Sequence, residues 1–346
     1  HPIQSDSPTD PSRAEPAWGG CGGRRFGLVE DRRSILSSRP VEFTPYSSTC
    51  PRHSGCGLVS RASDGHILRD MTTRTLASLH PAVRDDIADL VTRRPVPGAG
   101  LDQVDPFLFL NHHGPQTYPP GNNGLPFGPH PHRGFETVTF ILEGNLAHHD
   151  TGGGESIVEA GGVQWMTAGK GLTHAELSPE SFKRSGGPLE ILQLWVNLPA
   201  RLKMTDPKYI PVTREDIPAV ELAPGVTMHP TSGTEGAPIE SLTGVMLATV
   251  EIAPGTSATL PAPKGRSVLF YTVRGSARVG PDEVPEHHLA KLTDGEGIAV
   301  SSEEGSLLLF GHADPIGEPV FAHGPFVMNT REEIVQAIRD HQAGMF

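Results

Sequence analysis

Cysteine is almost absent from this sequence, and its three cysteines, Cys21, Cys50 and Cys56, all lie before position 60. The remainder of the chain therefore has no disulfide framework and no thiolate that could bind a metal ion. The opening residues also lack the apolar segment that a secretory signal carries. These absences fit a reducing compartment, and we expect a cytoplasmic protein.

Long apolar runs and an excess of basic residues are also missing. No stretch reaches the roughly 18 apolar residues of a membrane-spanning helix. The sequence has 28 Lys and Arg against 40 Asp and Glu, a formal net charge of −12. Residues 1–70 hold nine of the basic and eight of the acidic residues, which leaves a net charge of −13 for 71–346. Because acidic surfaces repel phosphate backbones, we expect neither a nucleic acid nor a membrane as direct partner.

The first 70 residues differ in composition from the rest. They are rich in Ser, Pro, Gly and Arg and have no sustained period of 2 or 3.6, which predicts a disordered extension outside the fold. The spacing C-x5-C between Cys50 and Cys56 matches none of the standard zinc fingers. We interpret residues 1–70 as an overlong start or an added extension with no role in the fold.

The remaining chain has the pattern of an all-β protein. Short apolar runs recur between Gly, Pro, Asn and Asp, for example at 138–142, 191–196 and 268–273. Their β-branched and aromatic residues are typical of strands in a sandwich or barrel. Residues 267–280 repeat the order found at 135–150, an apolar strand, a glycine turn and a return strand, which indicates internal symmetry. Two jelly-roll barrels would close the sheet edges of such a chain.

Two stretches depart from this β pattern. Residues 199–224 are polar and contain several prolines, so we expect them to connect the two barrels. At 331–341, Ile334, Ala337 and Ile338 recur at helical spacing. Thr330 and Glu333 form a capping-box pattern ahead of them, which predicts a short C-terminal helix.

The most informative residues are four candidate metal ligands. His130 and His132 stand two residues apart, and so do His174 and Glu176. Because side chains alternate faces along a strand, both members of each pair point the same way. Three imidazoles and one carboxylate suit a divalent transition metal and suit calcium or magnesium poorly. Four ligands leave two positions open in an octahedral shell, as metal catalysis requires.

A second carboxylate competes for the fourth position. Glu136 lies four residues after His132, so on a regular strand it faces the same side. If Glu176 is the ligand, we expect Arg133 and Glu136 to pair with each other or to support the strand. We expect residues 164–165 on the wall of the metal site opposite them.

Three pairs of adjacent histidines are weaker candidates. Neighbouring residues of a strand face opposite ways, so neither 148–149 nor 287–288 offers two ligands to one ion. One member of 148–149 faces the pocket, or both lie on the surface. We expect 112–113, in LNHHGP, to belong to a turn that leaves an early strand.

Four segments in order carry a resemblance to a known family. GLPFGPHPHRGFETVTFILEG at 124–144 and GGVQWMTAGKGLTHAE at 161–176 follow the two metal-binding motifs of cupin barrels. Together with LQLWVNLPARLKMTDPKY at 192–209 and HGPFVMNT at 323–330, they resemble the pirin family. The resemblance begins near Met71, where the segment looks like the ordinary start of a bacterial pirin-like chain.

The resemblance implies an iron-binding bicupin. The expected domains are a metal-binding cupin barrel at 71–200, a connection at 201–223, and a second barrel with the helix at 224–346. His130, His132, His174 and Glu176 are then the ligands of one divalent transition metal, and we expect this metal to be Fe(II). The second barrel has Pro-Lys-Gly-Arg at 263–266 where the first has its paired histidines, so we expect no metal there. In pirin-like folds the segment around His323 returns to pack on the N-terminal half.

The resemblance also implies two classes of function. Pirin-like proteins open the ring of the flavonol quercetin with O2 as 2,3-dioxygenases, with Glu176 here as ligand and base. We expect this activity, on a small aromatic substrate, with Phe127, Phe135, Trp165 and Met166 lining a cleft. The alternative is a non-enzymatic, iron- or redox-dependent regulator of transcription factors or of a metabolic enzyme. A cupin isomerase and an inert structural metal are further alternatives, and we expect a monomer.

Overall fold

The computed structural model describes residues 72–346, and these belong to one compact unit, 66–346. The predictions for residues 1–70, a disordered extension without a zinc site, lie outside the described residues. Among the described helices, none is long and apolar enough to cross a membrane.

The first barrel consists of two antiparallel sheets. One has seven strands in the order β12-β9-β6-β11-β4-β3-β2, and the other has four in the order β5-β10-β7-β8. The strands are β2 (Val83–Arg84), β3 (Thr92–Val96), β4 (Phe107–Tyr118), β5 (Phe127–His132), β6 (Phe135–Glu143), β7 (Asn145–Asp150), β8 (Glu155–Glu159), β9 (Val163–Thr167), β10 (Leu172–Leu177), β11 (Gly187–Asn197) and β12 (Lys208–Val212). Short helices follow three of these strands: α1 (Glu180–Ser185) follows β10, η1 (Ala200–Leu202) follows β11, and η2 (Arg214–Asp216) follows β12.

The second barrel repeats this arrangement. Its seven-stranded sheet has the order β1-β20-β17-β22-β15-β14-β13, and its four-stranded sheet the order β16-β21-β18-β19. The strands are β1 (Leu76–Pro81), β13 (Val220–Ala223), β14 (Val226–Ser232), β15 (Met246–Ile252), β16 (Thr256–Pro261), β17 (Ser267–Gly275), β18 (Ala277–Val279), β19 (Asp282–Val284), β20 (His288–Leu292), β21 (Gly297–Ser302) and β22 (Ser306–Ala313). Together with the first barrel they confirm the predicted all-β bicupin.

The predicted apolar runs form the central strands β6, β11 and β17. Val138 and Phe140 of β6 belong to a buried cluster that also contains Leu269 and Tyr271 of β17. Ile141 of the same strand belongs to a different cluster inside the first barrel. Both faces of β6 are therefore buried, one toward the second barrel and one toward its own barrel interior. This explains why the buried apolar residues Phe140 and Ile141 follow one another directly rather than alternating with polar residues.

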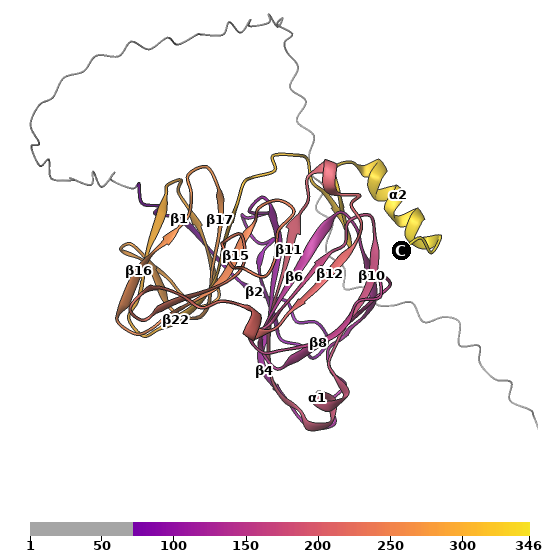
Figure 1. Ribbon diagram of the computed structural model, residues 1–346, viewed down its shortest axis with the longest axis horizontal. Helices are drawn as coiled ribbons and strands as arrows, with labels where there is room; N and C mark the ends of the chain where they lie inside the picture. The colour runs from indigo at the N-terminus through magenta and orange to yellow at the C-terminus, as the bar shows by residue number, and fades with distance from the viewer. Residues whose placement is uncertain (1–71) are drawn as a thin grey trace, which may run out of the picture. The chain divides into compact units, whose positions relative to one another are not determined.

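The ends of the described chain cross between the barrels. β1 comes first in the sequence but pairs with β20 of the second barrel, Leu79 opposite Ala290. The last segment forms β23 (Phe321–His323), β24 (Phe326–Met328) and α2 (Arg331–Gln342). Figure 1 shows this yellow segment returning to the side of the first barrel, where Val327 N donates to Arg133 O at 3.0 Å. The domain limits 71–200, 201–223 and 224–346 stay predictions.

The predicted C-terminal helix is confirmed as α2. Thr330 Oγ1 accepts from Glu333 N, and the Glu333 side chain accepts from Thr330 N, which completes the capping box. Ile334 and Ala337 form its buried side and pack with Phe326 and Met328 of β24. The helix is thus attached to the hairpin that returns to the first barrel.

Candidate metal centre

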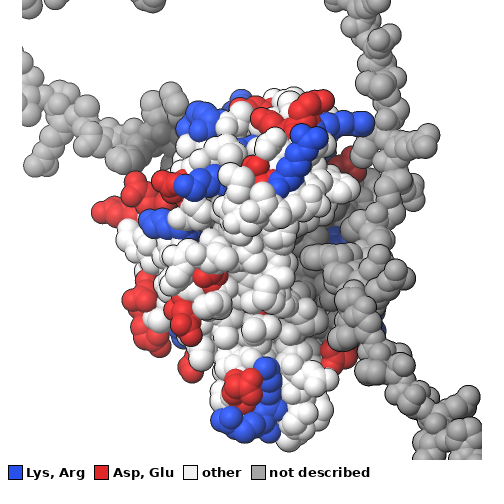
Figure 2. All heavy atoms as spheres, turned by 90° about the vertical axis from the view of Figure 1, so that its right-hand side faces the viewer, with Lys and Arg blue, Asp and Glu red and all other residues white. Residues whose placement is uncertain are grey.

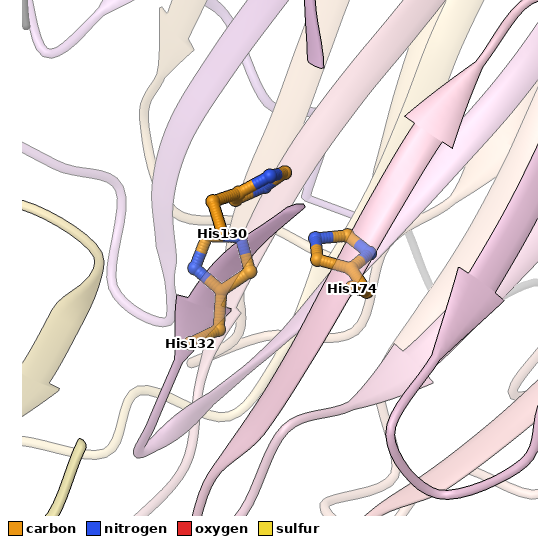
Figure 3. A group of neighbouring side chains, drawn as sticks. All are labelled: His130, His132 and His174. Atoms are coloured by element: carbon orange, nitrogen blue, oxygen red, sulfur yellow. The ribbon is translucent and has the colours of Figure 1, made fainter. Parts of the chain in front are cut away.

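Strand pairing brings three of the predicted ligands together. β5 and β10 are antiparallel neighbours, with Leu172 opposite His132. Figure 3 shows the three imidazoles gathered between these strands, and one nitrogen from each lies within 4.8 Å of the others. Nitrogens that share one ion at about 2.1 Å lie no more than roughly 4 Å apart. The nitrogens would therefore have to approach one another by roughly 1 to 2 Å to share one ion.

The remaining ring nitrogens are arranged as they are in metal sites. Nδ1 of His130 lies 2.8 Å from Gly128 O, and Nδ1 of His132 lies 3.3 Å from Pro325 O. A carbonyl that accepts from one nitrogen leaves the other free to bind a metal. Both nitrogens of His174 are buried without a hydrogen-bond partner among the described residues. An unpaired buried polar group is costly, and a metal ion at this point would satisfy it.

Burial also lowers the pKa of two of these histidines, His132 and His174. Desolvation, assisted by the neighbouring His130, lowers the pKa of His132 to about 3. Desolvation, with the nearby His132, His130 and His148, lowers the pKa of His174 well below its ordinary value. Both imidazoles are therefore neutral at physiological pH, which is the state that binds metal. The donor set fits a divalent transition metal.

Glu176 is buried beside the histidines, but its carboxylate bonds elsewhere. Thr139 Oγ1 donates to its Oε1 at 3.0 Å, and Gln193 Nε2 donates to its Oε2 at 2.5 Å. It is not one of the three side chains whose donor atoms gather within 4.8 Å. A small cavity of about 10 Å³ adjoins Glu176 and is also lined by Thr139, Gln193 and His113, room for roughly one water molecule. The role of Glu176 as the fourth ligand stays a prediction.

The competing carboxylate supports the sheet. Glu136 Oε1 accepts from Trp165 Nε1 at 3.0 Å and from Thr167 Oγ1 at 2.6 Å, both on β9. Burial raises the pKa of Glu136, although these two hydrogen bonds oppose the shift. Of the two expected alternatives, the structure shows support of the strand and not the pair, because Arg133 Nη1 bonds Asp340 Oδ2 at 2.6 Å. Glu136 instead links β6 to β9.

One of the paired histidines at 148–149 faces the site. His148 is buried, and its ring lies 5.3 Å from that of His174, whereas His149 is exposed. His148 Nε2 lies 2.7 Å from Asp150 Oδ2, and its ring stacks on Tyr209 at 3.7 Å. The sequence analysis did not identify Asp150, although the i, i+2 spacing from His148 placed both on one strand face.

The histidines at 112–113 were predicted to lie in a turn, and this is wrong. Both are buried within β4. His113 Nδ1 lies 2.9 Å from Thr92 Oγ1 inside the first barrel. His112 faces the second barrel, with Nδ1 3.0 Å from Tyr271 Oη and Nε2 2.8 Å from Glu190 Oε1. They form part of the interface and core rather than a ligand pair.

In the second barrel, residues 263–266 occupy the turn after β16, where Arg266 Nη2 donates to main-chain oxygens. Within residues 72–346, the histidines of the first barrel are the one group with metal-binding geometry. The expectation that the second barrel binds no metal stays a prediction.

The expected aromatic wall is only partly formed by the predicted residues. Phe135 lies 5.1 Å from the His132 ring and 4.5 Å from Trp195, which itself lies 5.4 Å from His132. The position of Trp195 beside His132 was not predicted, because the run at 191–196 was recognised only as a buried strand. Trp165 instead belongs to the core between the barrels, and Met166 packs with Tyr209.

Comparisons with known proteins agree with this architecture. The family model for pirin matches residues 89–196, and the model for the pirin C-terminal cupin domain matches 247–346. Human pirin is 39% identical over 261 residues, covering 72% of this chain and 85% of the relative. A Pseudomonas aeruginosa protein, provisionally named a quercetin 2,3-dioxygenase, is 38% identical over 248 residues, with 70% and 87% covered.

Solved structures show the same relationship. A crystal structure of quercetin 2,3-dioxygenase from Acinetobacter baumannii is 31% identical, with a TM-score of 0.75, and covers 79% of this chain and 98% of that one. The bacterial pirin YhhW of Escherichia coli, solved with nickel(II), is 21% identical, with a TM-score of 0.56. The match covers 69% of this chain and 99% of that one, and it supports the fold. Two barrels, a three-histidine cluster on β5 and β10, and these similarities establish that the chain belongs to the pirin family.

Proposed function

We propose that this chain is a metal-dependent dioxygenase that opens the ring of quercetin-type flavonols with O2. The observation that carries the proposal is the cluster of His130, His132 and His174, in which one nitrogen of each ring lies within 4.8 Å of the others. The 31% identity to the Acinetobacter baumannii quercetin 2,3-dioxygenase over 98% of that chain supports the same reaction class. The activity is confined to the first barrel, 71–200.

The three histidines hold the metal, and Glu176 is the fourth ligand and the base. A bound divalent ion would supply Lewis acidity toward an anionic substrate oxygen. Glu176 takes the proton from the substrate hydroxyl, since it is buried two residues after His174 on the same strand β10. Thr139 and Gln193 hold the carboxylate oxygens and set their direction. Fe(II) is the proposed metal, although sites of this kind generally bind nickel and copper more tightly.

The substrate enters from the side of His130. This histidine is only half-buried, whereas His132 and His174 are buried. The cavity beside Glu176, about 10 Å³, has no room for a bicyclic molecule. A flavonol therefore lies over the exposed side of His130 with its reacting oxygen toward the cluster. A larger cavity of about 370 Å³ lies between the barrels, near Arg214 and His229, and none of the proposed ligands lines it.

The surface is consistent with a small-molecule substrate. Figure 2 shows a face on which Lys and Arg mix with Asp and Glu and form no continuous basic stripe. Together with the net charge of −13 over residues 71–346, derived from the composition, this opposes binding to nucleic acid.

The small cavity also favours a second candidate function. A regulator that senses the charge of its metal needs a surface but no enclosed substrate pocket. On this reading the metal-bearing end of the first barrel contacts a regulatory protein.

The deciding experiment measures metal content first and oxygen uptake second. Purified protein is analysed for bound metals, reloaded with Fe(II) without oxygen, and then mixed with a panel of flavonols in an oxygen electrode. The dioxygenase proposal expects oxygen uptake that a chelator abolishes. Fully loaded protein that consumes no oxygen with any flavonol would contradict it and favour the regulatory function.

A further inference from the structure

Residues 321–346, called here the return segment, lie against both strands that carry the metal ligands. On the β5 side, Arg133 N donates to Pro325 O at 3.4 Å, and Val327 N donates to Arg133 O at 3.0 Å. The same Pro325 carbonyl lies 3.3 Å from His132 Nδ1. The return segment therefore provides the carbonyl that orients one of the proposed ligands.

The β10 side has its own contacts with the segment. Thr173 Oγ1 donates to Phe346 O at 3.2 Å, directly before His174. A Cβ atom on Gly171 would lie 2.5 Å from Phe346 Cγ, so the ring occupies the space that a side chain would need. Arg133 lies 4.6 Å over the same ring. One segment thus contacts the residues next to His132 and next to His174.

A single buried lysine joins the segment to the first barrel. Lys203 is 1% exposed. Its Nζ donates to Gly134 O at 2.9 Å, to Asn197 Oδ1 at 2.7 Å and to Val327 O at 3.1 Å. All three donors of the ammonium group are therefore used. Gly134 lies two residues after His132, and a Cβ atom added to it would lie 2.0 Å from Val327 O, so the two backbones touch.

We propose that Lys203 is a positioning residue for the metal centre, because it fixes the return segment so that Pro325 O holds His132 in its metal-binding orientation. The inference rests on the proposed metal centre. It adds that residues beyond the first barrel determine the affinity for the metal. Partners one step outside the ligands typically change metal affinity by about 10-fold to 100-fold when removed.

The test is a titration of metal-free protein with Co(II), whose absorption spectrum reports coordination without any substrate. Lys203→Met keeps the aliphatic chain and removes the three hydrogen bonds. We expect its Kd for Co(II) to rise about 10-fold, with a changed Co(II) spectrum. Lys208→Met is the matched control, because Lys208 is exposed on β12 and should leave the Kd unchanged.

A second variant covers the case in which Lys203→Met fails to fold. Asp340 lies on α2, and Asp340→Asn removes its ion pair with Arg133. Glu332→Gln is the control, because Glu332 is exposed on the same helix. Asp340→Asn should raise the Kd about threefold, the scale of a partly exposed ion pair.

The outcomes separate this inference from the proposed function. Wild-type protein that binds no Co(II) would overturn both. Normal Co(II) affinity and spectrum in Lys203→Met, with only a lower Tm for the metal-free protein, would make Lys203 purely structural. If that variant does not fold, an unchanged Kd in Asp340→Asn would overturn the inference.

Discussion

His174 lies directly opposite His130 across the antiparallel pair of β10 and β5, with their ring centroids 4.4 Å apart. Because the backbones are fixed by the ladder of hydrogen bonds, the two imidazoles meet whether or not a metal is bound. Preorganised ligands bind metal without first ordering the chain. The cluster should therefore depend on its own side chains more than the fold depends on the cluster.

The first prediction concerns the histidines. His130→Ala or His132→Ala should remove the bound metal and leave the barrel folded, since the core clusters contain neither residue. Metal content by elemental analysis and circular dichroism of the same samples check this. His149→Ala, exposed on the neighbouring strand β7, should retain the metal. A His130→Ala chain that does not fold would show a structural metal.

The second prediction separates the two carboxylates. Glu176→Gln should weaken metal binding, because it removes the only charged ligand of the proposed set. Glu136→Gln should retain the metal, since the carboxylate of Glu136 accepts from Trp165 and Thr167. It should instead lower the free energy of unfolding by about 1–3 kcal/mol, the scale of a disturbed buried hydrogen bond. The reverse pattern of metal retention would exchange their roles.

The third prediction places the activity in the first barrel. Glu176→Ala should abolish oxygen uptake with a flavonol, because both the ligand and the base are lost. Lys264→Ala, exposed in the second barrel, and removal of residues 1–70 should each leave the rate unchanged. The measurement is oxygen uptake per bound Fe(II). Loss of uptake in Lys264→Ala would refute the confinement to one barrel.

The fourth prediction concerns pH and the free energy of unfolding. Burial lowers the pKa of His113 to about 3 from an ordinary value of 6.5, helped by the nearby His112 and Arg94. Between these values the unfolded chain binds the proton and the folded chain does not. The contribution of neutral His113 to the free energy of unfolding is therefore fully present above pH 6.5. It falls as the pH drops toward 3, by up to about 1.4 kcal/mol per pH unit.

Urea unfolding of metal-free protein at several pH values between 7 and 5 measures this slope. His113→Gln removes the titrating group and should make the slope shallower, whatever its effect on stability at pH 7. An equal slope in the variant and the wild type would contradict the assignment.

The ligand pairs were predictable because their signal is local. Spacing of two residues fixes a common strand face, and this holds for His130 and His132 wherever the strand lies. The turn predicted at 112–113 failed for a tertiary reason. Gly114 and Pro115 do not end the strand; β4 continues through them with a shifted register against β11. Pairing with β11 outweighed the local turn preference of glycine and proline.

The support around the ligands had no such signal. Pro325 O lies against a histidine 193 positions earlier in the sequence, and nothing in either segment specifies this contact. Trp195 and Asp150 also lie beside the cluster, on β11 and β7, which were predicted only as an apolar run and a return strand. Fold class follows from short-range patterns, whereas the surroundings of a site follow from which distant strands become neighbours.

β1 pairs with the second barrel, and the return segment pairs with the first barrel, so neither barrel is complete as a continuous fragment of the chain. The barrel that binds the metal is synthesised early, but Lys203 and Pro325 that hold its ligand are added later. The second barrel likewise needs β1, which is synthesised before the first barrel is begun. A fragment cut at residue 200 would lack the edge strand β12 as well as Lys203 and Pro325, so its histidines would be loosely held. Metal loading in the cell should follow release of the finished chain rather than accompany its synthesis.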